Sequence, residues 1–288
     1  MRKAKLLRVV ILLAAMSFVG YINGQDADCV LDNQLGINRN VNGKVKSINE
    51  TGYKAEAKFG EIELGDKEYI IQKKYDNAGQ LSEYNKFDVG YGENWTYKYE
   101  YNDKGACVKI LEYVKYSSDS SIKLVAKSIF EYDEEGNLLK LSIYDNKGNI
   151  KNTYIYKYNS DNNLSERMQY GADNKLSGTQ EYKYDGKEYL LEEHGLISKK
   201  VYSYNNGKLS KISSYWVSLA GGNLSLAFIS TYNQYGDCVE WKDFGGSRTY
   251  SYQYTYDDKG NWIKEIIYYN DIDGLPYPIE LKIRKIDY

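Results

Sequence analysis

A short tyrosine-rich motif recurs along the chain and limits what the chain can fold into. Its consensus is Tyr, Asp or Asn, two polar residues, Gly, a small or polar residue, and an apolar residue. The clear copies begin at Tyr75, Tyr101, Tyr132, Tyr144, Tyr232 and Tyr256. Repetition on a scale of roughly 20–30 residues is typical of arrays whose units bury surface only against one another. The sequence therefore predicts a repeat architecture, and it indicates no reaction.

The centre of the motif has the composition of a tight turn. Asp or Asn accepts hydrogen bonds from backbone N–H groups two residues on, and Gly adopts the positive φ that ends a three-residue hairpin loop. The predicted turn pairs are Asp76 and Gly79, Asn102 and Gly105, Asp133 and Gly136, Asp145 and Gly148, Asn233 and Gly236, and Asp257 and Gly260. Because Asn cannot act as a carboxylic acid, the exchange of Asp and Asn at this position favours a turn over acid–base catalysis.

Weaker copies of the motif begin at Tyr158, Tyr184 and Tyr204, with altered loops. In the first of them, we expect asparagine at 162–163 to replace glycine at positive φ. Alternating aromatics flank the motifs, as in Tyr97-Lys-Tyr-Glu-Tyr101, and this period of two is typical of strands. The predicted fold class is all-β: an antiparallel meander of repeated β-hairpins that forms a strongly curved or barrel-like sheet, because a long sheet twists and tends to curl or close.

The N-terminus predicts export. Four basic residues precede an uncharged, mostly apolar stretch that is too short to span a bilayer comfortably, which is the pattern of a signal peptide over residues 1–24. We expect an N-terminal extension at 25–42 and a single repeat domain at 43–288. Without the four basic residues of the leader, 34 of the 38 basic residues remain against 40 acidic ones. This mildly acidic balance indicates no nucleic-acid partner, and no second apolar run predicts a transmembrane helix.

The three cysteines have different sequence contexts. Cys107 and Cys238 occupy the apolar position of the motif, so we expect them to be small buried hydrophobic residues. Cys29 follows the leader closely, but Asp26 and Asp28 lie at the −3 and −1 positions, which disfavours a lipid anchor. Whether all three thiols are free stays open.

The motif resembles the YD repeat of RHS-type proteins, most closely at residues 132–138 and 256–262. The segment 43–60 resembles the opening of small exported YD-repeat-like proteins of Gram-negative bacteria, and the resemblance extends over roughly residues 43–270. It implies β architecture, export and interaction with the envelope or cell surface. The chain departs from the large members, because it has few repeats and no toxin-like domain after them. Their encapsulating role is therefore not expected here.

Candidate catalytic and metal-binding residues are scarce. The single histidine, His194, lies between charged residues and a glycine, which favours a solvated loop, and no Gly-x-Ser-x-Gly motif accompanies it. Asp271-Ile-Asp-Gly274 lacks the later ligands of a calcium loop. We therefore expect no catalytic residue, no cofactor and no metal site.

Aromatic side chains supply the one binding hypothesis. Flat rings stack on sugar faces, although packing within the sheet is the more economical role for most of the tyrosines. Trp216 and Trp241 lie outside the turn cores and are the candidates for exposed ligand contacts.

The main functional hypothesis is an exported, non-enzymatic binding or structural module that contacts a glycan or another envelope component. The expected location is periplasmic, outer-membrane-associated or secreted. The alternative is an outer-membrane β-barrel, although a mean hydropathy of −0.65 and a lysine- and glutamate-rich strand face are unfavourable for it. A hydrolase that uses two carboxylates is the least supported hypothesis.

Overall fold

The computed structural model describes residues 41–119, 121–186, 189–218, 223–245, 248–270 and 275–288. Within these ranges, all regular elements are β-strands. The strands are β1 (Ser47–Lys58), β2 (Glu61–Tyr75), β3 (Leu81–Asp88), β4 (Glu93–Tyr101), β5 (Cys107–Tyr116), β6 (Lys123–Tyr132), β7 (Leu138–Asp145), β8 (Ile150–Tyr158), β9 (Leu164–Gly171), β10 (Leu176–Tyr184), β11 (Leu190–His194), β12 (Ser198–Asn205), β13 (Lys208–Val217), β14 (Leu224–Tyr232), β15 (Cys238–Asp243), β16 (Arg248–Tyr256), β17 (Trp262–Asn270) and β18 (Pro276–Asp287). The described residues contain no helix long and apolar enough to cross a membrane.

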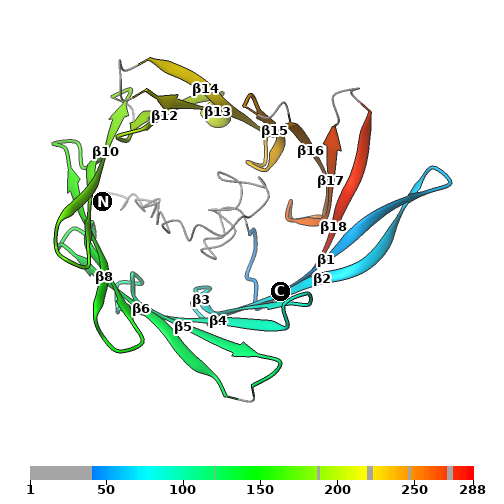
Figure 1. The fold of residues 1–288 in the computed structure, drawn as a ribbon, viewed down its shortest axis with the longest axis horizontal. Coiled ribbons are helices and arrows are strands. Elements are labelled where there is room, and N and C mark those ends of the chain that lie inside the picture. Colours follow the sequence, from blue (N-terminus) through cyan, green and yellow to red (C-terminus); the bar gives the residue numbers. More distant parts are fainter. Residues whose placement is uncertain (1–40, 120, 187–188, 219–222, 246–247, 271–274) are drawn as a thin grey trace, which may run out of the picture.

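The strands form one closed antiparallel ring in which each strand pairs with the next along the chain (Figure 1). β1 pairs both with β2 and with β18, so the last strand meets the first. The predicted antiparallel meander is confirmed, and its curvature is complete: the sheet is a β-barrel of 18 strands. Strands about 4.8 Å apart and tilted by about 40° enclose a barrel roughly 36 Å across between backbones.

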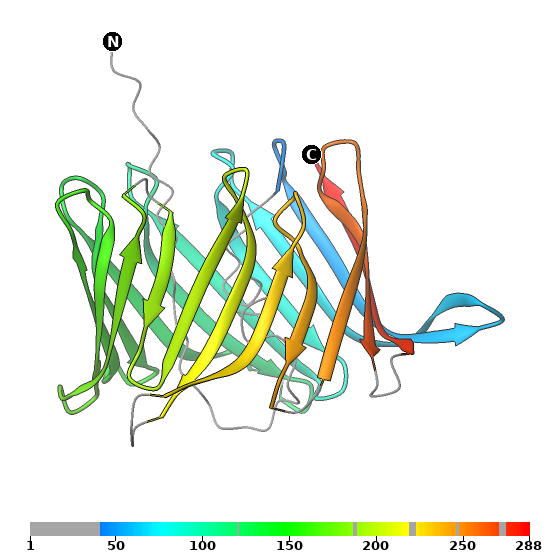
Figure 2. The ribbon, with the colours of Figure 1, turned by 90° about the horizontal axis from the view of Figure 1, so that it is seen from above.

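The two ends of the barrel carry different connections (Figure 2). We call the end with the connections after β2, β4, β6, β8, β10, β12, β14 and β16 the motif rim, because most copies of the tyrosine motif turn there. The other end, with the connections after β1, β3, β5, β7, β9, β11, β13, β15 and β17, is the opposite rim. The copy that begins at Tyr144 is an exception, because it joins β7 to β8 at the opposite rim.

The motif turns have the predicted chemistry. Oδ1 of Asp76 accepts hydrogen bonds from the backbone N–H groups of Ala78 at 2.9 Å and Gln80 at 2.8 Å. Gly79 has φ of 80°, and the other five glycines of the clear copies also have positive φ. In the weaker copy, Asn162 has φ of 62° and takes the place of glycine, as predicted. The Asp/Asn position therefore serves the turn, where its oxygen satisfies two backbone donors.

The tyrosine that opens the motif joins neighbouring hairpins. The hydroxyl of Tyr101 donates to the backbone carbonyl of Leu81 at 2.8 Å. Tyr132 donates to Cys107 at 2.7 Å, and Tyr158 donates to the carbonyl of Leu138 at 3.0 Å. In each case the acceptor is the apolar motif residue of the preceding hairpin at this rim. The repeat therefore holds consecutive hairpins together by a hydrogen bond that sequence analysis did not predict.

The two faces of the sheet differ in burial. The tyrosines next to the motifs share a face that is largely buried, with Tyr154 at 2% exposure and Tyr252 at 6%. Closing a sheet crowds side chains on its concave side and spreads them on its convex side, so this face forms the inner wall. The motif position that Cys107 and Cys238 occupy is on this inner face. Cys238 is buried, Cys107 is half-buried, and both thiols are free. Cys29, the predicted signal peptide and the expected extension as far as residue 40 lie outside the described residues.

Candidate functional site: the inner wall

A row of aromatic rings crosses five neighbouring strands on the inner wall. From β14 to β18, the ring centroids are 5.9 Å apart for Phe228 and Trp241, 5.5 Å for Trp241 and Tyr250, and 5.3 Å for Tyr250 and Tyr269. Tyr277 extends the row at 5.4 Å from Tyr269. Such spacings are those of favourable aromatic contacts, so the row stabilises this part of the sheet.

The row has exposed aromatic side chains at its margins. Tyr277 is 49% exposed, whereas Trp241 and Tyr250 are 6% and 8% exposed. Trp216 is 55% exposed and lies two residues beyond Ser214, the cross-strand partner of Phe228, so it is on the same face of the sheet. Both exposed rings lie near the opposite rim. A ligand that enters the barrel at this end therefore meets Trp216 and Tyr277 before the buried rings.

Charged side chains occupy the inner wall where β17, β18, β1 and β2 meet. Arg284 donates from Nη2 to Oε2 of Glu50 at 2.9 Å, and its guanidinium lies 3.3 Å from the ring centroid of Trp262. Lys282 approaches Glu265 to 3.0 Å. The side chains of Arg284 and Glu50 are 7% and 8% exposed, so this pair is buried between the first and last strands. We call the five residues named here and Lys73 the seam cluster.

Burial and neighbouring charges set the protonation of the seam cluster. Burial opposes ionisation of Glu50, but Arg284, Lys73 and Lys282 outweigh it and hold the pKa of the carboxyl below its usual value. Burial, together with the charge of Arg284, lowers the pKa of Lys73 to about 8. Burial raises the pKa of Glu265 despite attraction to Lys282. The cluster therefore sets three basic side chains against two carboxyls at the closure of the barrel, and Lys73 is its weakest base.

The two tryptophans proposed from sequence have different environments. Trp216 is exposed, as expected, but the expectation of an exposed Trp241 is wrong, because the stacked rings of Phe228 and Tyr250 cover it. The indole N–H of Trp241 is buried and has no hydrogen-bond partner among the described residues. A period-two pattern places Trp241 on a face, but only the neighbouring strands determine how much of the ring they cover.

His194 is in a strand and not in a loop, which corrects the prediction. It ends β11, and its Nε2 lies 2.7 Å from Oε2 of Glu192. Glu192 also accepts from Lys199 at 2.7 Å, and its hydrogen bonds with Lys199 and His194 lower the pKa of its carboxyl to about 2. His194 is thus part of a surface ion network on the outer wall. The segment Asp271–Gly274 lies outside the described residues.

The outer wall carries a ladder of cross-strand ion pairs close to the motif rim. Five consecutive hairpins contribute one pair each: Lys74–Glu83 at 2.8 Å, Glu100–Lys109 at 2.7 Å, Glu131–Lys140 at 2.8 Å, Lys157–Glu166 at 2.7 Å and Lys183–Glu192 at 3.5 Å. One member of each pair immediately precedes the motif tyrosine, so strand alternation puts the charge outside and the tyrosine inside. We call these five pairs the ion-pair ladder.

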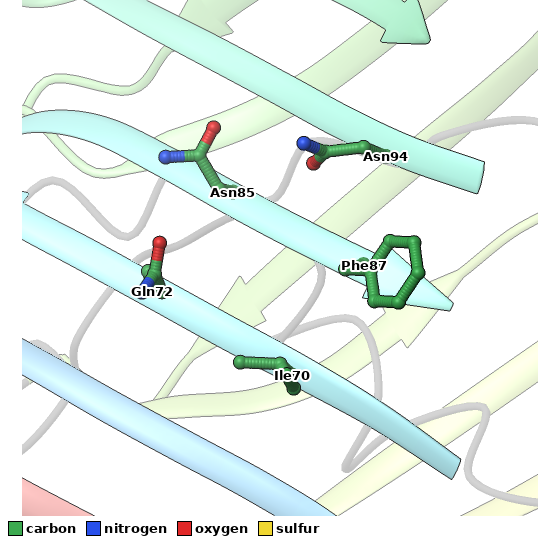
Figure 3. Close-up of a pocket in the computed structure, with 5 residues that line it drawn as sticks. All are labelled: Ile70, Gln72, Asn85, Phe87 and Asn94. Carbon is green, nitrogen blue, oxygen red and sulfur yellow. The ribbon is translucent and has the colours of Figure 1, made fainter. Parts of the chain in front are cut away.

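A shallow depression of about 320 Å³ lies on the outer wall over β2, β3 and β4 (Figure 3). Ile70, Gln72, Asn85, Phe87 and Asn94 line it. Asn85 accepts a hydrogen bond from Thr96 at 2.7 Å, whereas Oδ1 of Asn94 is buried without a partner among the described residues. The depression is open and its lining includes three amide side chains but no charged group, so the inner wall is the stronger candidate site.

Sequence analysis missed the seam cluster. Glu50 and Arg284 are 234 residues apart and belong to no motif copy. The available signal was weak: Lys73, Glu265 and Arg284 each lie on the inner-facing register of a strand, where the neighbouring positions are tyrosines or aliphatic residues.

No protein-family model matches the chain, and no curated protein matches it in sequence. The structure is similar to a porin-like protein from Bacteroides uniformis ATCC 8492, with a TM-score of 0.42 and 12% identity over 86% of this chain and 98% of that chain. A porin-like protein from Bacteroides vulgatus ATCC 8482 gives a TM-score of 0.25 and 11% identity over 84% and 98%. A chain in the crystal structure of TcdB2–TccC3–Cdc42 gives 0.33 and 13% identity over 75% of this chain, which spans 11% of that chain. At these identities the likenesses concern the fold alone.

Proposed function

We propose that the chain is an exported, non-enzymatic barrel of the cell envelope that binds a glycan or a chemically similar envelope component at its inner wall. The observation that carries this proposal is the aromatic row with exposed Trp216 and Tyr277 at its margins. Ring faces contact the C–H faces of sugars, and the tyrosine hydroxyl is available to a sugar hydroxyl.

The repeated acids support a non-enzymatic role. Five of the motif positions in the sequence hold Asp, and in the structure the described carboxylates of this position accept backbone N–H groups of their own turns. A carboxylate used in this way is held at the rim of the barrel and is engaged by the turn. The inner-wall acids Glu50 and Glu265 pair with Arg284 and Lys282. These groups therefore serve the fold.

A glycan array followed by titration calorimetry tests the proposal. Trp216→Ala and Tyr277→Ala should each weaken saturable binding at least about tenfold, because each removes an exposed stacking surface. Phe244→Ala is the matched control: Phe244 is 47% exposed at the same rim, but it follows Asp243, the partner of Phe228, and so lies on the other face of the sheet. Absence of binding, or an equal loss in the control, would refute the proposal.

An outer-membrane β-barrel is the second candidate, favoured by closure of 18 strands into a ring without free edges. The ion-pair ladder opposes it only weakly, because lysines on a lipid-facing wall cost about 2–4 kcal/mol each at the bilayer midplane but about 0–1 kcal/mol near the interfaces, where a ladder next to the rim would lie. Extraction of cell envelopes distinguishes the two candidates. A membrane-spanning barrel stays with the membrane in alkaline carbonate and needs detergent for release, whereas the envelope module proposed here is released by carbonate.

A further inference from the structure

Exposed apolar side chains gather at the opposite rim. Of the 19 large apolar side chains that are exposed among the described residues, 14 lie in the connections of this rim or within two residues of the strand ends that enter it. All nine connections contribute at least one, although the β1–β2 hairpin, whose turn contains Phe59, projects sideways from the barrel (Figures 1 and 2). The 14 residues are Phe59, Val89, Tyr91, Tyr116, Ile122, Ile150, Leu176, Leu196, Ile197, Trp216, Leu224, Phe244, Leu275 and Tyr277. We call this set the apolar ring.

The motif rim lacks such a ring. Only Leu139, Leu191 and Tyr235 are comparably exposed in or next to its described connections, and Tyr235 packs on Tyr256 with ring centroids 4.3 Å apart. The ion-pair ladder lies on the outer wall near this rim. Exposed apolar tips are therefore concentrated at the opposite rim. Scattered single apolar residues need no explanation, but a concentration at one end does.

The spacing of the ring decides which partner fits it. Neighbouring connections at one rim are two strands apart, or roughly 10–12 Å along the rim. Single side chains at this spacing do not form the contiguous, closely packed core that a stable protein–protein interface needs. A fluid lipid layer fills the space between separate tips, and aromatic and aliphatic side chains on a polar scaffold are typical of interfacial anchors.

The charges of the rim point to a lipid surface without net charge. Several connections pair their charges internally: Lys58 lies 2.7 Å from Glu56, Lys123 lies 2.8 Å from Asp119, and Lys175 lies 3.2 Å from Asp173. Such local pairing leaves little field to attract an anionic surface. Binding of this rim to a lipid layer would therefore depend on insertion of apolar side chains and not on charge attraction.

We propose that the opposite rim docks on a lipid layer, with the apolar ring inserted among zwitterionic headgroups and the motif rim directed away from the layer. In this arrangement the barrel stands on the layer and does not cross it. The mouth near Trp216 and Tyr277 then faces the lipid. The inference goes beyond the glycan-binding proposal, because it depends on the tips of the connections, and of these only Trp216 and Tyr277 belong to both proposals.

Co-sedimentation of the purified protein with phosphatidylcholine vesicles tests the proposal. The rim variant Tyr91→Ser, Ile122→Ser, Leu196→Ser, Leu275→Ser should reduce the vesicle-bound fraction at least about tenfold, because it removes four of the most exposed apolar tips. The matched control is Leu139→Ser, Leu191→Ser, Ile283→Ser, which removes exposed apolar side chains outside the ring and should bind as the parent does. Circular dichroism checks that both variants keep the β spectrum.

Quenching of tryptophan fluorescence reports which rim of the barrel faces the vesicle. Phosphatidylcholine brominated near the headgroup should quench Trp216, which is 55% exposed, and Trp216→Phe should remove most of that quenching, because Trp95 and Trp241, each two residues from a strand end at the same rim, are less exposed. Raising the salt concentration from 0.1 to 0.5 M should change binding by less than about twofold.

Three results would overturn the proposal. They are no binding to phosphatidylcholine, binding that requires anionic lipid and disappears in salt, and a rim-dependent dimer in analytical ultracentrifugation in place of vesicle binding. Glycan binding by the rim variant is measured in parallel, so failure of one proposal is distinguishable from failure of the other.

Discussion

Glu50→Gln is the perturbation that best tests how the barrel closes. Glu50 in β1 and Arg284 in β18 form a buried pair at 2.9 Å between the first and last strands. The substitution keeps the shape of the side chain but removes its charge, which leaves Arg284 and the buried Lys73 without their shared anion. Removing one partner of a buried ion pair costs about 3–5 kcal/mol, because the other charge stays desolvated.

The loss of stability in Glu50→Gln can be measured by thermal unfolding. For a domain of this size, 1 kcal/mol corresponds to roughly 2–4 °C in Tm, so a loss of about 4 kcal/mol lowers Tm by roughly 8–16 °C. Trp262 reports on the site directly, because the guanidinium of Arg284 lies 3.3 Å from its ring centroid and the stack should loosen in the variant. Denaturant titration followed by tryptophan fluorescence gives an independent free energy.

Two comparisons make the test specific. Glu83→Gln breaks a pair of the same kind on the outer wall, Lys74–Glu83 at 2.8 Å, where the lysine side chain is 61% exposed. It should cost less than about 1 kcal/mol. The double variant Glu50→Met, Arg284→Met removes both buried charges and should recover most of the loss. Equal effects of Glu50→Gln and Glu83→Gln, or a double variant as unstable as the single one, would show that the pair does not determine closure.

Three further predictions concern the motif and the seam cluster, and denaturant midpoints measure each of them. The free energy of unfolding of Asp133→Asn should stay within about 0.5 kcal/mol of the parent value. Asp133→Ala should lose about 1–2 kcal/mol, because the backbone N–H of Asn137 is left without an acceptor. Equal losses in the two variants would contradict the turn role. Tyr132→Phe removes the hydrogen bond to the carbonyl of Cys107 and should lower the free energy of unfolding by about 1 kcal/mol. No loss of stability would mean that this bond contributes nothing to hairpin association. Between pH 8 and 9.5 the unfolded chain keeps the proton of Lys73 that the folded chain loses, so the stability of the parent should rise relative to that of Lys73→Met by at most about 2 kcal/mol, while the tyrosines and Cys107 act equally in both proteins. A constant stability difference between the two proteins over this range would contradict the assignment.

The motif turns and the strand pattern were predictable because they depend on neighbours in sequence. Asp76 reaches the N–H groups two and four residues on, and Gly79 adopts positive φ, whatever the rest of the chain does. Alternation similarly places Tyr97, Tyr99 and Tyr101 on one face. Even so, the motif did not determine at which end a turn lies, since the Tyr144 copy joins strands at the opposite rim.

The candidate site was predictable only in part, for a related reason. Aromatic residues were expected to contribute to it, but exposure depends on which strands lie alongside: Trp216 is exposed near the end of β13, whereas Phe228 and Tyr250 cover Trp241. The apolar ring was not predictable at all. Its members share no local pattern, and they form a set only because every second connection returns to the same end of the barrel.

By itself, the sequence determined the antiparallel hairpins, their turn chemistry and the segregation of tyrosine from charge on the two faces. These properties follow from interactions over a few residues, in which backbone dihedrals and strand alternation dominate. Only the tertiary structure decided that the sheet closes with 18 strands, that Glu50 meets Arg284 across 234 residues, and that the two rims differ. Closure requires the first and last strands to match in register and charge, and this pairing has no counterpart in local sequence.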